Sequence, residues 1–282
     1  MKFNDILIAI VLSILWGINY VAIEVGVMQF PPIFMMGLRF IIVAVFLLPA
    51  IVQTPRDKWF ELFLISVTMG LIYFSLLFTG VHYVPAGEAS ILVQLQVPIS
   101  VLLSAVFLKE ALSFRVVMGI AIALLGVIVT IGIPNRGGSL LGVLLLLGSA
   151  LMWAISSLQI KVLGKISPLQ LNGMMALMAM PQLLVASYFL EHGQWQSVRD
   201  FSWAGWIGIL YTAVISSILC YSIWFKLIQK YEINKVVPFS LLVPIFGVMA
   251  SHVVADEPLI PHIIIGGLIC IAGLALVVVK KG

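Results

Sequence analysis

The sequence predicts an all-α integral membrane protein of ten transmembrane helices, arranged as two inverted five-helix repeats with the N- and C-termini in the cytoplasm. Three observations lead to this fold class. Hydrophobic residues make up 62% of the chain and charged residues only 9%, whereas soluble domains carry about 25% charged residues. Apolar runs of membrane-spanning length follow one another from end to end, and landmarks of the first half return in the second. A lipid bilayer is the solvent that suits such a chain.

Ten spans fit the length of the chain. A helix needs about 20 mainly apolar residues to cross a bilayer, so each span with its connection takes roughly 28 residues, and 282 residues hold about ten. The runs are continuous and about twice as long as the alternating segments of a β-barrel, which indicates helices. In chain order, the predicted spans are residues 6–27, 33–52, 62–82, 87–108, 114–133, 139–160, 169–190, 204–225, 236–255 and 262–279.

Helix breakers and charged residues justify the end of each span in turn, because proline interrupts helices and charges avoid hydrocarbon. The successive breaks contain, in order, Pro31-Pro32, Thr54-Pro55-Arg56-Asp57, Pro85, Lys109-Glu110, Pro134-Asn135-Arg136-Gly137-Gly138, Ser167-Pro168, Glu191-His192-Gly193, Lys230-Tyr231-Glu232 and Asp256-Glu257-Pro258.

Lysine and arginine residues set the orientation. With the N-terminus in the cytoplasm, the cytoplasmic ends of the spans hold twelve of these residues and the outer ends hold two, Arg136 and Arg199. Positive residues concentrate on the cytoplasmic side of membrane proteins, and an even number of spans returns the C-terminus to that side. We therefore expect a multi-pass protein of the inner membrane, and we attribute the net charge of +4 to this topology and not to nucleic-acid binding.

The two halves of the chain resemble each other. Trp16 in the first predicted span is matched by Trp153 in the sixth, 137 residues later, and Pro98 in the fourth span by Pro244 in the ninth, 146 residues later. We expect one repeat in residues 1–134 and the second in residues 135–282. Five spans are an odd number, so the second repeat is inverted relative to the first, a plan that recurs in transporters.

Glycines recur on the last span of each half. Gly119 and Gly126 in the fifth span match Gly266 and Gly273 in the tenth, 147 residues later. Small residues let helices approach closely. We expect these faces to pack within one chain rather than between two chains, while the choice between a monomer and a homodimer stays open.

Four stretches, each on the expected span, resemble the EamA-type members of the drug/metabolite transporter superfamily. They are Trp16-Gly17-Ile18-Asn19-Tyr20, Pro31-Pro32 followed by Gly37-Leu38-Arg39-Phe40, Pro85-Ala86-Gly87-Glu88-Ala89-Ser90 leading to Gln94 and Gln96, and Val236-Val237-Pro238-Phe239-Ser240-Leu241-Leu242-Val243-Pro244. Within that family the chain is most similar to the exporters of cysteine and O-acetylserine. The resemblance implies a central cavity lined by helices 1–4 and 6–9, and export of small polar metabolites such as amino acids or their derivatives.

Other functions remain as alternatives. The same fold serves efflux of drugs or nucleosides, and import instead of export. The sequence has no His-Glu-x-x-His motif, no paired aspartates within spans and no Asp-rich metal–phosphate motif, so we expect no enzyme, no metal and no other cofactor. A channel would favour rings of charge or a filter loop, whereas inverted repeats suit alternating access.

Three charged residues lie within predicted spans, where ionisable groups usually face a cavity or a partner. Arg39 either holds a substrate carboxylate or forms a structural pair with a glutamate. Glu24 and Glu88 are candidates for proton coupling, Glu88 also for substrate binding, and the alternative places both at the wet interface.

Polar side chains and prolines mark the fourth and ninth spans. Ser90, Gln94 and Pro98 share one helical face, and each proline leaves the carbonyl one turn earlier without its usual donor. Ser240 and Pro244 repeat this arrangement. We expect Ser90, Gln94 and Ser240 to line the cavity and Pro98 and Pro244 to kink their helices, while Gln96 is expected to point elsewhere.

Aromatic and small polar residues complete the candidate site. Trp16 and Trp153 lie near the middle of their spans, and Asn19 and Ser156 follow them by three residues. The remaining candidates for the cavity wall are Tyr73, Tyr211 and Tyr221. We expect Trp224, near the end of its span, to be an interfacial anchor of the kind that tryptophan often provides.

Overall fold

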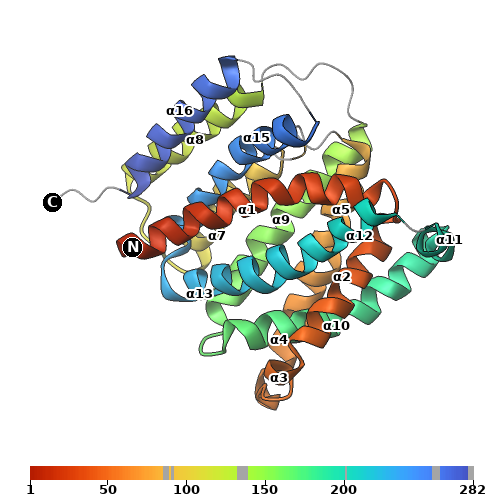
Figure 1. Ribbon diagram of the computed structural model, residues 1–282. Coiled ribbons are helices and arrows are strands. Elements are labelled where there is room, and N and C mark those ends of the chain that lie inside the picture. Colours follow the sequence, from red (N-terminus) through yellow and green to blue (C-terminus); the bar gives the residue numbers. More distant parts are fainter. Residues whose placement is uncertain (85–88, 90–91, 132–138, 201, 256–260, 279–282) are drawn as a thin grey trace.

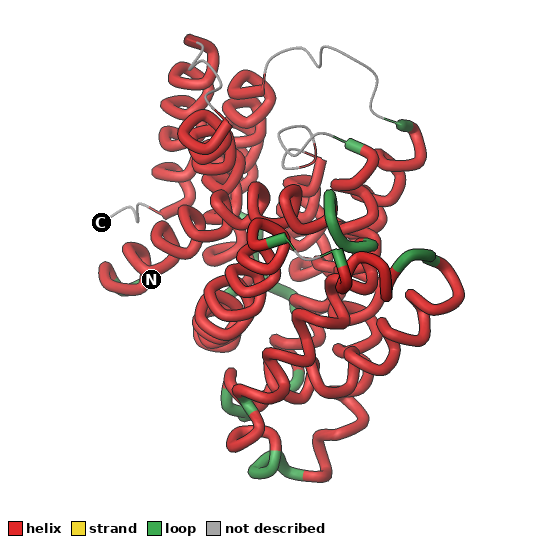
Figure 2. The backbone as a smooth tube through the Cα atoms, turned by 45° about the vertical axis from the view of Figure 1, so that its right-hand side comes forward, coloured by secondary structure: helices red, strands yellow, loops and turns green. Residues whose placement is uncertain are grey.

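The computed structural model describes residues 1–84, 89, 92–131, 139–200, 202–255 and 261–278. Within these ranges the chain forms only helices and connecting loops (Figure 2). The predicted all-α class is therefore confirmed for the part of the chain that the structure describes.

The first half contains mostly long helices that are broken into shorter pieces at special positions. Its elements are α1 (Phe3–Val27), α2 (Pro32–Phe46), α3 (Leu48–Ile51), η1 (Arg56–Lys58), α4 (Trp59–Ile65), η2 (Ser66–Tyr73), α5 (Phe74–Tyr83), η3 (Val93–Leu95), α7 (Gln96–Phe107) and α8 (Phe114–Ile131).

The second half has a similar order, with the short helix α11 at the place where the first half has α3 and η1. Its elements are α9 (Leu140–Val162), α10 (Pro168–Leu190), α11 (Gln194–Arg199), α12 (Trp203–Leu210), η4 (Tyr211–Tyr221), α13 (Ser222–Lys230), α14 (Ile233–Val236), η5 (Val237–Leu242), α15 (Val243–Ala255) and α16 (Pro261–Val278).

Six helical stretches in the described ranges are long and apolar enough to cross a membrane. They are Phe3–Val27, Arg56–Tyr83, Leu140–Val162, Pro168–Leu190, Trp203–Lys230 and Ile233–Ala250. Four shorter apolar helices overlap the predicted spans at 33–52, 87–108, 114–133 and 262–279. The count of ten spans therefore stays a prediction.

Two π-helical segments occupy matching places in the two halves. η2 continues α4 and ends at Tyr73, and η4 continues α12 and ends at Tyr221. A π-helix is rare, and short π segments inside α-helices are often found at functional sites. Both terminal tyrosines turn toward the centre of the bundle, where they are buried.

Tight 3₁₀ turns precede the two conspicuous prolines. η3 ends directly before α7, whose third residue is Pro98, and η5 ends directly before α15, whose second residue is Pro244. Because proline has no N–H to donate to the carbonyl four residues earlier, the regular α-helical bonding is interrupted at Gln94 and Ser240. The helix geometry thus changes at the residues that the sequence marks as kinks.

The main packing contacts join one half of the chain to the other. α8 lies along α16, α2 along α10, and α1 along α15, while α9 packs against both α5 and α7 (Figure 1). A Cβ atom at Gly273 on α16 would lie 2.6 Å from the carbonyl oxygen of Gly119 on α8. The expected packing of glycine-bearing faces within one chain is present at this pair, and the two halves interlock into one bundle.

Carboxylates at helix ends form hydrogen bonds between the two halves of the chain. Glu110, after α7, accepts hydrogen bonds from two backbone N–H groups at the start of α14, at 3.0 and 3.3 Å. Glu191, after α10, accepts from two N–H groups at the start of α2, at 2.7 and 2.9 Å. The first N–H groups of a helix lack partners within the helix and carry partial positive charge, so an anion stabilises them.

Candidate functional site

A small cavity lies in the centre of the bundle, between helices of both halves. Its volume is about 40 Å³, space for no more than a few water molecules. The residues around it are almost all buried and come from α1, α2, η2, α5, η3, α7, α9, η4, η5 and α15. They are Trp16, Asn19, Tyr20, Ile23, Arg39, Tyr73, Phe74, Leu77, Phe78, Gln94, Gln96, Trp153, Tyr221, Ser240 and Val243.

Most of the described residues that the sequence marks as candidates meet at this cavity. The structure brings together Trp16, Asn19, Arg39, Tyr73, Gln94, Trp153, Tyr221 and Ser240. Glu24 is partly buried on α1 and is not among the lining residues. Glu88 and Ser90 lie outside the described residues.

Two candidates lie elsewhere in the bundle. The hydroxyl of Ser156 donates to the carbonyl oxygen of Met152 at 2.7 Å and lies 3.2 Å from the hydroxyl of Thr68. The hydroxyl of Tyr211 donates to the carbonyl oxygen of Leu15 at 2.9 Å. Both groups are thus bonded between helices, away from the lining of the cavity.

An aromatic cluster forms one wall of the cavity. The ring of Trp16 lies 6.0 Å from Trp153, 5.1 Å from Tyr221 and 5.0 Å from Trp224, measured between centroids. The predicted interfacial role of Trp224 is wrong, because its side chain is fully buried. The helix that carries it continues to Lys230, so Trp224 lies well inside the helix and not at its end.

Arg39 is a buried cation among aromatic rings. Its side chain is 1% exposed, and its Cζ atom lies 4.7 Å from the ring centre of Phe74, within the range of cation–π attraction. Its Nε donates to the hydroxyl of Ser217 at 2.6 Å and its Nη1 to the sulfur of Met36 at 3.7 Å. These bonds lead to a serine and a methionine rather than to the glutamate of the structural pairing left open by the sequence.

Several polar atoms of the lining residues are buried without a hydrogen-bond partner in the described part of the chain. They are three donors, Nη2 of Arg39 and Nε1 of Trp16 and Trp153, and two acceptors, Oδ1 of Asn19 and Oε1 of Gln96. Leaving a buried polar group without a partner costs about 1–3 kcal/mol. The cavity is therefore suited to a small ligand that offers both donors and acceptors.

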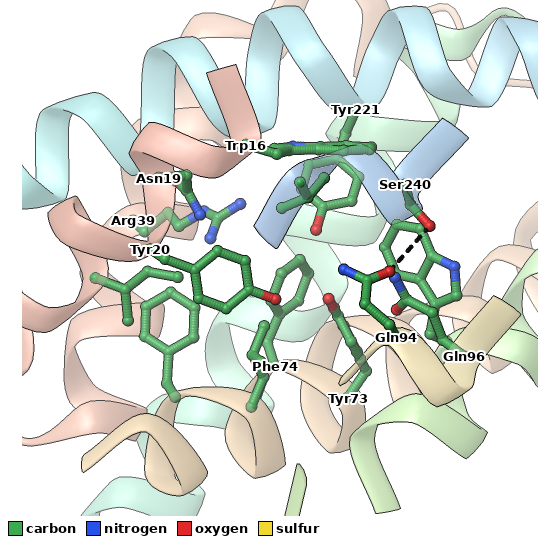
Figure 3. A pocket seen from close by; sticks show the side chains of 15 residues that line it. Trp16, Asn19, Tyr20, Arg39, Tyr73, Phe74, Gln94, Gln96, Tyr221 and Ser240 are labelled. Atoms are coloured by element: carbon green, nitrogen blue, oxygen red, sulfur yellow. Dashed lines mark hydrogen bonds between the residues drawn. The ribbon is translucent and has the colours of Figure 1, made fainter. Parts of the chain in front are cut away.

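Polar groups gather at two sides of the cavity. Figure 3 shows Arg39 and Asn19 on one side, and Gln94, Gln96 and Ser240 on the other. The hydroxyl of Ser240 lies 3.5 Å from the amide oxygen of Gln94.

Phenol hydroxyls reach between these two sides. Those of Tyr20, Tyr73 and Tyr221 point toward the middle of the space (Figure 3). A ligand in the cavity would thus meet a cation at one end, amides at the other and hydroxyls along its length.

Sequence reasoning missed two of these polar residues. Gln96 was expected to point elsewhere, and that prediction is wrong because Gln96 lines the cavity beside Gln94. Tyr20 follows Trp16 by four residues, a spacing that places both on one face of a helix. That spacing is the signal that could have found Tyr20.

Comparisons with known proteins agree with this architecture. The sequence profile of the EamA-like transporter family matches residues 4–132 and again residues 140–279. A solved structure described only as "Crystal structure of protein" superposes with a TM-score of 0.80 over 98% of this chain and 96% of that chain, at 17% identity. At this identity the likeness shows the fold alone.

Curated relatives cover nearly the whole chain. A protein of Salmonella typhimurium is 32% identical over 97% of this chain and 94% of its own length, and one of Escherichia coli is 30% identical over the same shares. Both are named probable amino-acid metabolite efflux pumps. An uncharacterized transporter of Bacillus subtilis is 29% identical over 99% of this chain and 93% of its own length. The chain therefore belongs to the EamA-like transporter family and is a multi-pass protein of the inner membrane.

Proposed function

We propose that this transporter exports small polar metabolites, amino acids or derivatives such as cysteine and O-acetylserine, through the central cavity by alternating access. The observation that carries the proposal is the set of buried donors and acceptors without partners around that cavity. The names of the Salmonella and Escherichia relatives support amino-acid metabolites as the class. A transporter, and not an enzyme, is the function that agrees with these names.

We also propose ten spans in two inverted repeats, residues 1–134 and 135–282, with both termini in the cytoplasm. The double match of the family profile supports two repeats. The unequal distribution of lysine and arginine supports the orientation. The pairing of α8 with α16 leaves these two helices beside the central group, as expected for peripheral spans.

The small volume of the cavity bears on the transport cycle. A space for no more than a few water molecules is too small for a cysteine molecule, so a bound substrate requires the lining side chains and helices to move apart. Alternating access supplies such a movement, because one group of helices rocks against the other around a fixed site. We therefore interpret the structure as the contracted form of the binding site.

Aromatic walls favour a second candidate substrate, a drug or nucleoside with a flat ring. Trp16, Trp153 and Tyr221 would stack on such a ring, a contact worth about 0.5–1.5 kcal/mol per aromatic pair. An apolar ligand would, however, cover the unpaired polar atoms of Arg39 and Gln96 without bonding them, at about 1–3 kcal/mol each. A polar metabolite avoids that cost and is the preferred candidate.

Efflux from cells that express the protein tests the proposed function. Cells loaded with labelled cysteine or O-acetylserine are expected to lose label faster than cells without the protein. Gln94→Ala and Arg39→Ala, at equal membrane abundance, are expected to reduce the difference severalfold. Ser156→Ala is a control within the bundle but outside the cavity, and it is expected to retain efflux.

The same experiment separates the alternatives. Faster uptake instead of loss would indicate import. Unchanged fluxes of both compounds would refute the proposed substrates, and a screen of nucleosides and drugs would then follow. Efflux that is undiminished in both cavity variants would contradict the central cavity as the binding site.

A further inference from the structure

Four aromatic residues of the cavity form two pairs that relate the halves of the chain. Trp16 of the first half is matched by Trp153 of the second, and Tyr73 at the end of η2 by Tyr221 at the end of η4. All four line the cavity. A symmetric wall alone would accept a ligand equally in either direction.

The polar residues break this symmetry. The position that corresponds to Arg39, counted from the proline that opens each helix, is Met175 in the second half, and the position that corresponds to Gln96 is Leu242. Neither Met175 nor Leu242 lines the cavity. Among the described lining residues, Arg39 carries the only charge. Arg39 and the amide of Gln96 both come from the first half, so the two ends of the cavity differ chemically.

Arg39 presents one free nitrogen at its end of the cavity. Its Nε and Nη1 are bonded, while Nη2 is buried without a partner in the described part of the chain. The hydrogen bonds that Arg39 makes with described residues go to neutral groups, and a buried cation gains stability from an anion in a membrane interior. A carboxylate is the small anionic group that matches a guanidinium best, because charge-assisted N–H···O bonds between them are short and strong.

Ser217 fixes the direction in which Arg39 points. Its hydroxyl accepts from Nε of Arg39 at 2.6 Å, and its carbonyl oxygen accepts from Nδ2 of Asn172 at 2.6 Å. Asn172 is in turn within 3.0 Å of the hydroxyl of Ser222. Ser217 does not line the cavity. It is a positioning residue that holds Nε and so leaves Nη2 for the ligand.

The opposite end offers hydrogen-bond acceptors. The amide oxygen of Gln96 is buried and has no partner among the described residues, and the amide of Gln94 lies beside it (Figure 3). Neutral amide oxygens accept well from an ammonium group. The two ends therefore match the two charged groups of an amino acid.

We infer that the cavity selects solutes that carry a carboxylate and binds them in one orientation, with the carboxylate on Arg39, positioned by Ser217, and a donor group toward Gln96. This inference rests on the proposed function, because it assigns a substrate class to the same cavity. It makes Arg39 the residue that discriminates between an amino acid and its decarboxylated amine.

Competition in proteoliposomes tests the inference. The purified full-length protein is reconstituted, and exchange of labelled cysteine is measured against three unlabelled competitors: cysteine, cysteamine, which lacks the carboxylate, and 3-mercaptopropionate, which lacks the amine. In the wild-type protein cysteine is expected to compete at least 10-fold better than cysteamine. Arg39→Gln is expected to reduce this ratio to near one, and Arg39→Lys to retain part of it.

A matched pair of serine variants tests the positioning role. Ser217→Ala is expected to lower the cysteine to cysteamine ratio severalfold while retaining exchange. Ser216→Ala, in the same π-helical segment, removes a buried hydroxyl that bonds to no described group, and it is expected to leave the ratio unchanged. Gln96→Leu is expected to affect the ratio of cysteine to 3-mercaptopropionate instead. Equal ratios in the wild type and Arg39→Gln would overturn the inference.

Direct binding separates failure of the inference from failure of the proposed function. If the wild-type protein exchanges no cysteine, quenching of its tryptophan fluorescence is measured with matched pairs of carboxylates and carboxylate-free analogues, beginning with benzoate and benzyl alcohol. A preference for carboxylates that Arg39→Gln removes would support the inference with another substrate. Absence of any such preference would overturn the inference.

Discussion

The carboxylate of Glu110 offers a quantitative test of the ties between the two halves. Replacement by glutamine removes the charge and one of the two acceptor oxygens, which face two N–H groups at 3.0 and 3.3 Å. Hydrogen bonds to charged groups contribute about 1.5–3 kcal/mol each when protected. Glu110 is half-buried and the amide keeps one bond, so we expect a loss of about 1–2 kcal/mol.

Thermal unfolding of the purified protein in detergent measures this loss. A change of 1 kcal/mol shifts the melting temperature of a protein of this size class by about 2–4 °C, so Glu110→Gln is expected to lower it by about 2–8 °C. Glu232→Gln is the control. Its ion pair with Lys235 is 2.7 Å long, but the two side chains are 48% and 45% exposed, and exposed pairs contribute only about 0–1 kcal/mol. A decrease for Glu110→Gln no larger than for Glu232→Gln would refute the reasoning.

Four further predictions follow from the same geometry. Gly273→Leu is expected to separate α16 from α8 and to lower the melting temperature by several degrees, at about 1–3 kcal/mol or more for overpacking; an unchanged melting temperature would contradict the close contact. Lys109→Gly is expected to stabilise by about 1 kcal/mol, because Lys109 holds a φ of 54° that glycine adopts without strain; equilibrium unfolding measures the gain. Trp224→Ala is expected to lower the free energy of unfolding by about 3–5 kcal/mol, as for other buried aromatic residues. A decrease of less than about 1 kcal/mol in unfolding experiments would contradict the burial of Trp224 and support an interfacial position. Glu24→Gln is expected to flatten the dependence of efflux on external pH if Glu24 couples transport to protons, and an unchanged pH profile rules that role out.

Hydropathy and composition predicted the all-helical membrane fold, because the bilayer restricts strongly which structures a chain can form. A chain inside hydrocarbon must satisfy its own backbone groups, which leaves helices as the solution for continuous apolar runs. Each predicted span overlaps helical residues in the described ranges, and six of the helical stretches there are long enough to cross a membrane. Internal repetition also predicted which residues would meet, since Trp16 and Trp153 approach each other only when the two halves interlock.

Local helix geometry explains the errors at the site. Gln94 and Gln96 point nearly opposite ways on an α-helix, where successive residues turn by about 100°. In the 3₁₀ turn η3, successive residues turn by about 120°, so the two amides are separated by a smaller angle and both reach the cavity. The sequence shows a proline nearby but not the extent of the 3₁₀ turn.

Contacts between individual side chains could not be predicted from the sequence for a different reason. The bond from Arg39 to Ser217 joins residues 178 positions apart, and no local pattern signals such a pair. The π-helical segment η4 also shifts the faces of its helix, so the side of the helix that carries Ser217 cannot be deduced by counting residues from the helix ends. The tertiary packing determines which side chains meet, and a single sequence does not show that packing.

The pairing of first-half helices with second-half helices has a consequence for how the protein is made. When the ribosome has finished the first half, α2 has no α10 to pack against, α8 has no α16, and α1 has no α15. These helices therefore remain in the membrane without their partners until the second half is inserted. Each can persist as a separate helix because its backbone hydrogen bonds are satisfied internally. Assembly of the bundle is therefore a late event, completed only when the last helix is inserted. A chain that stops early is not a smaller transporter but a set of membrane helices without their partners.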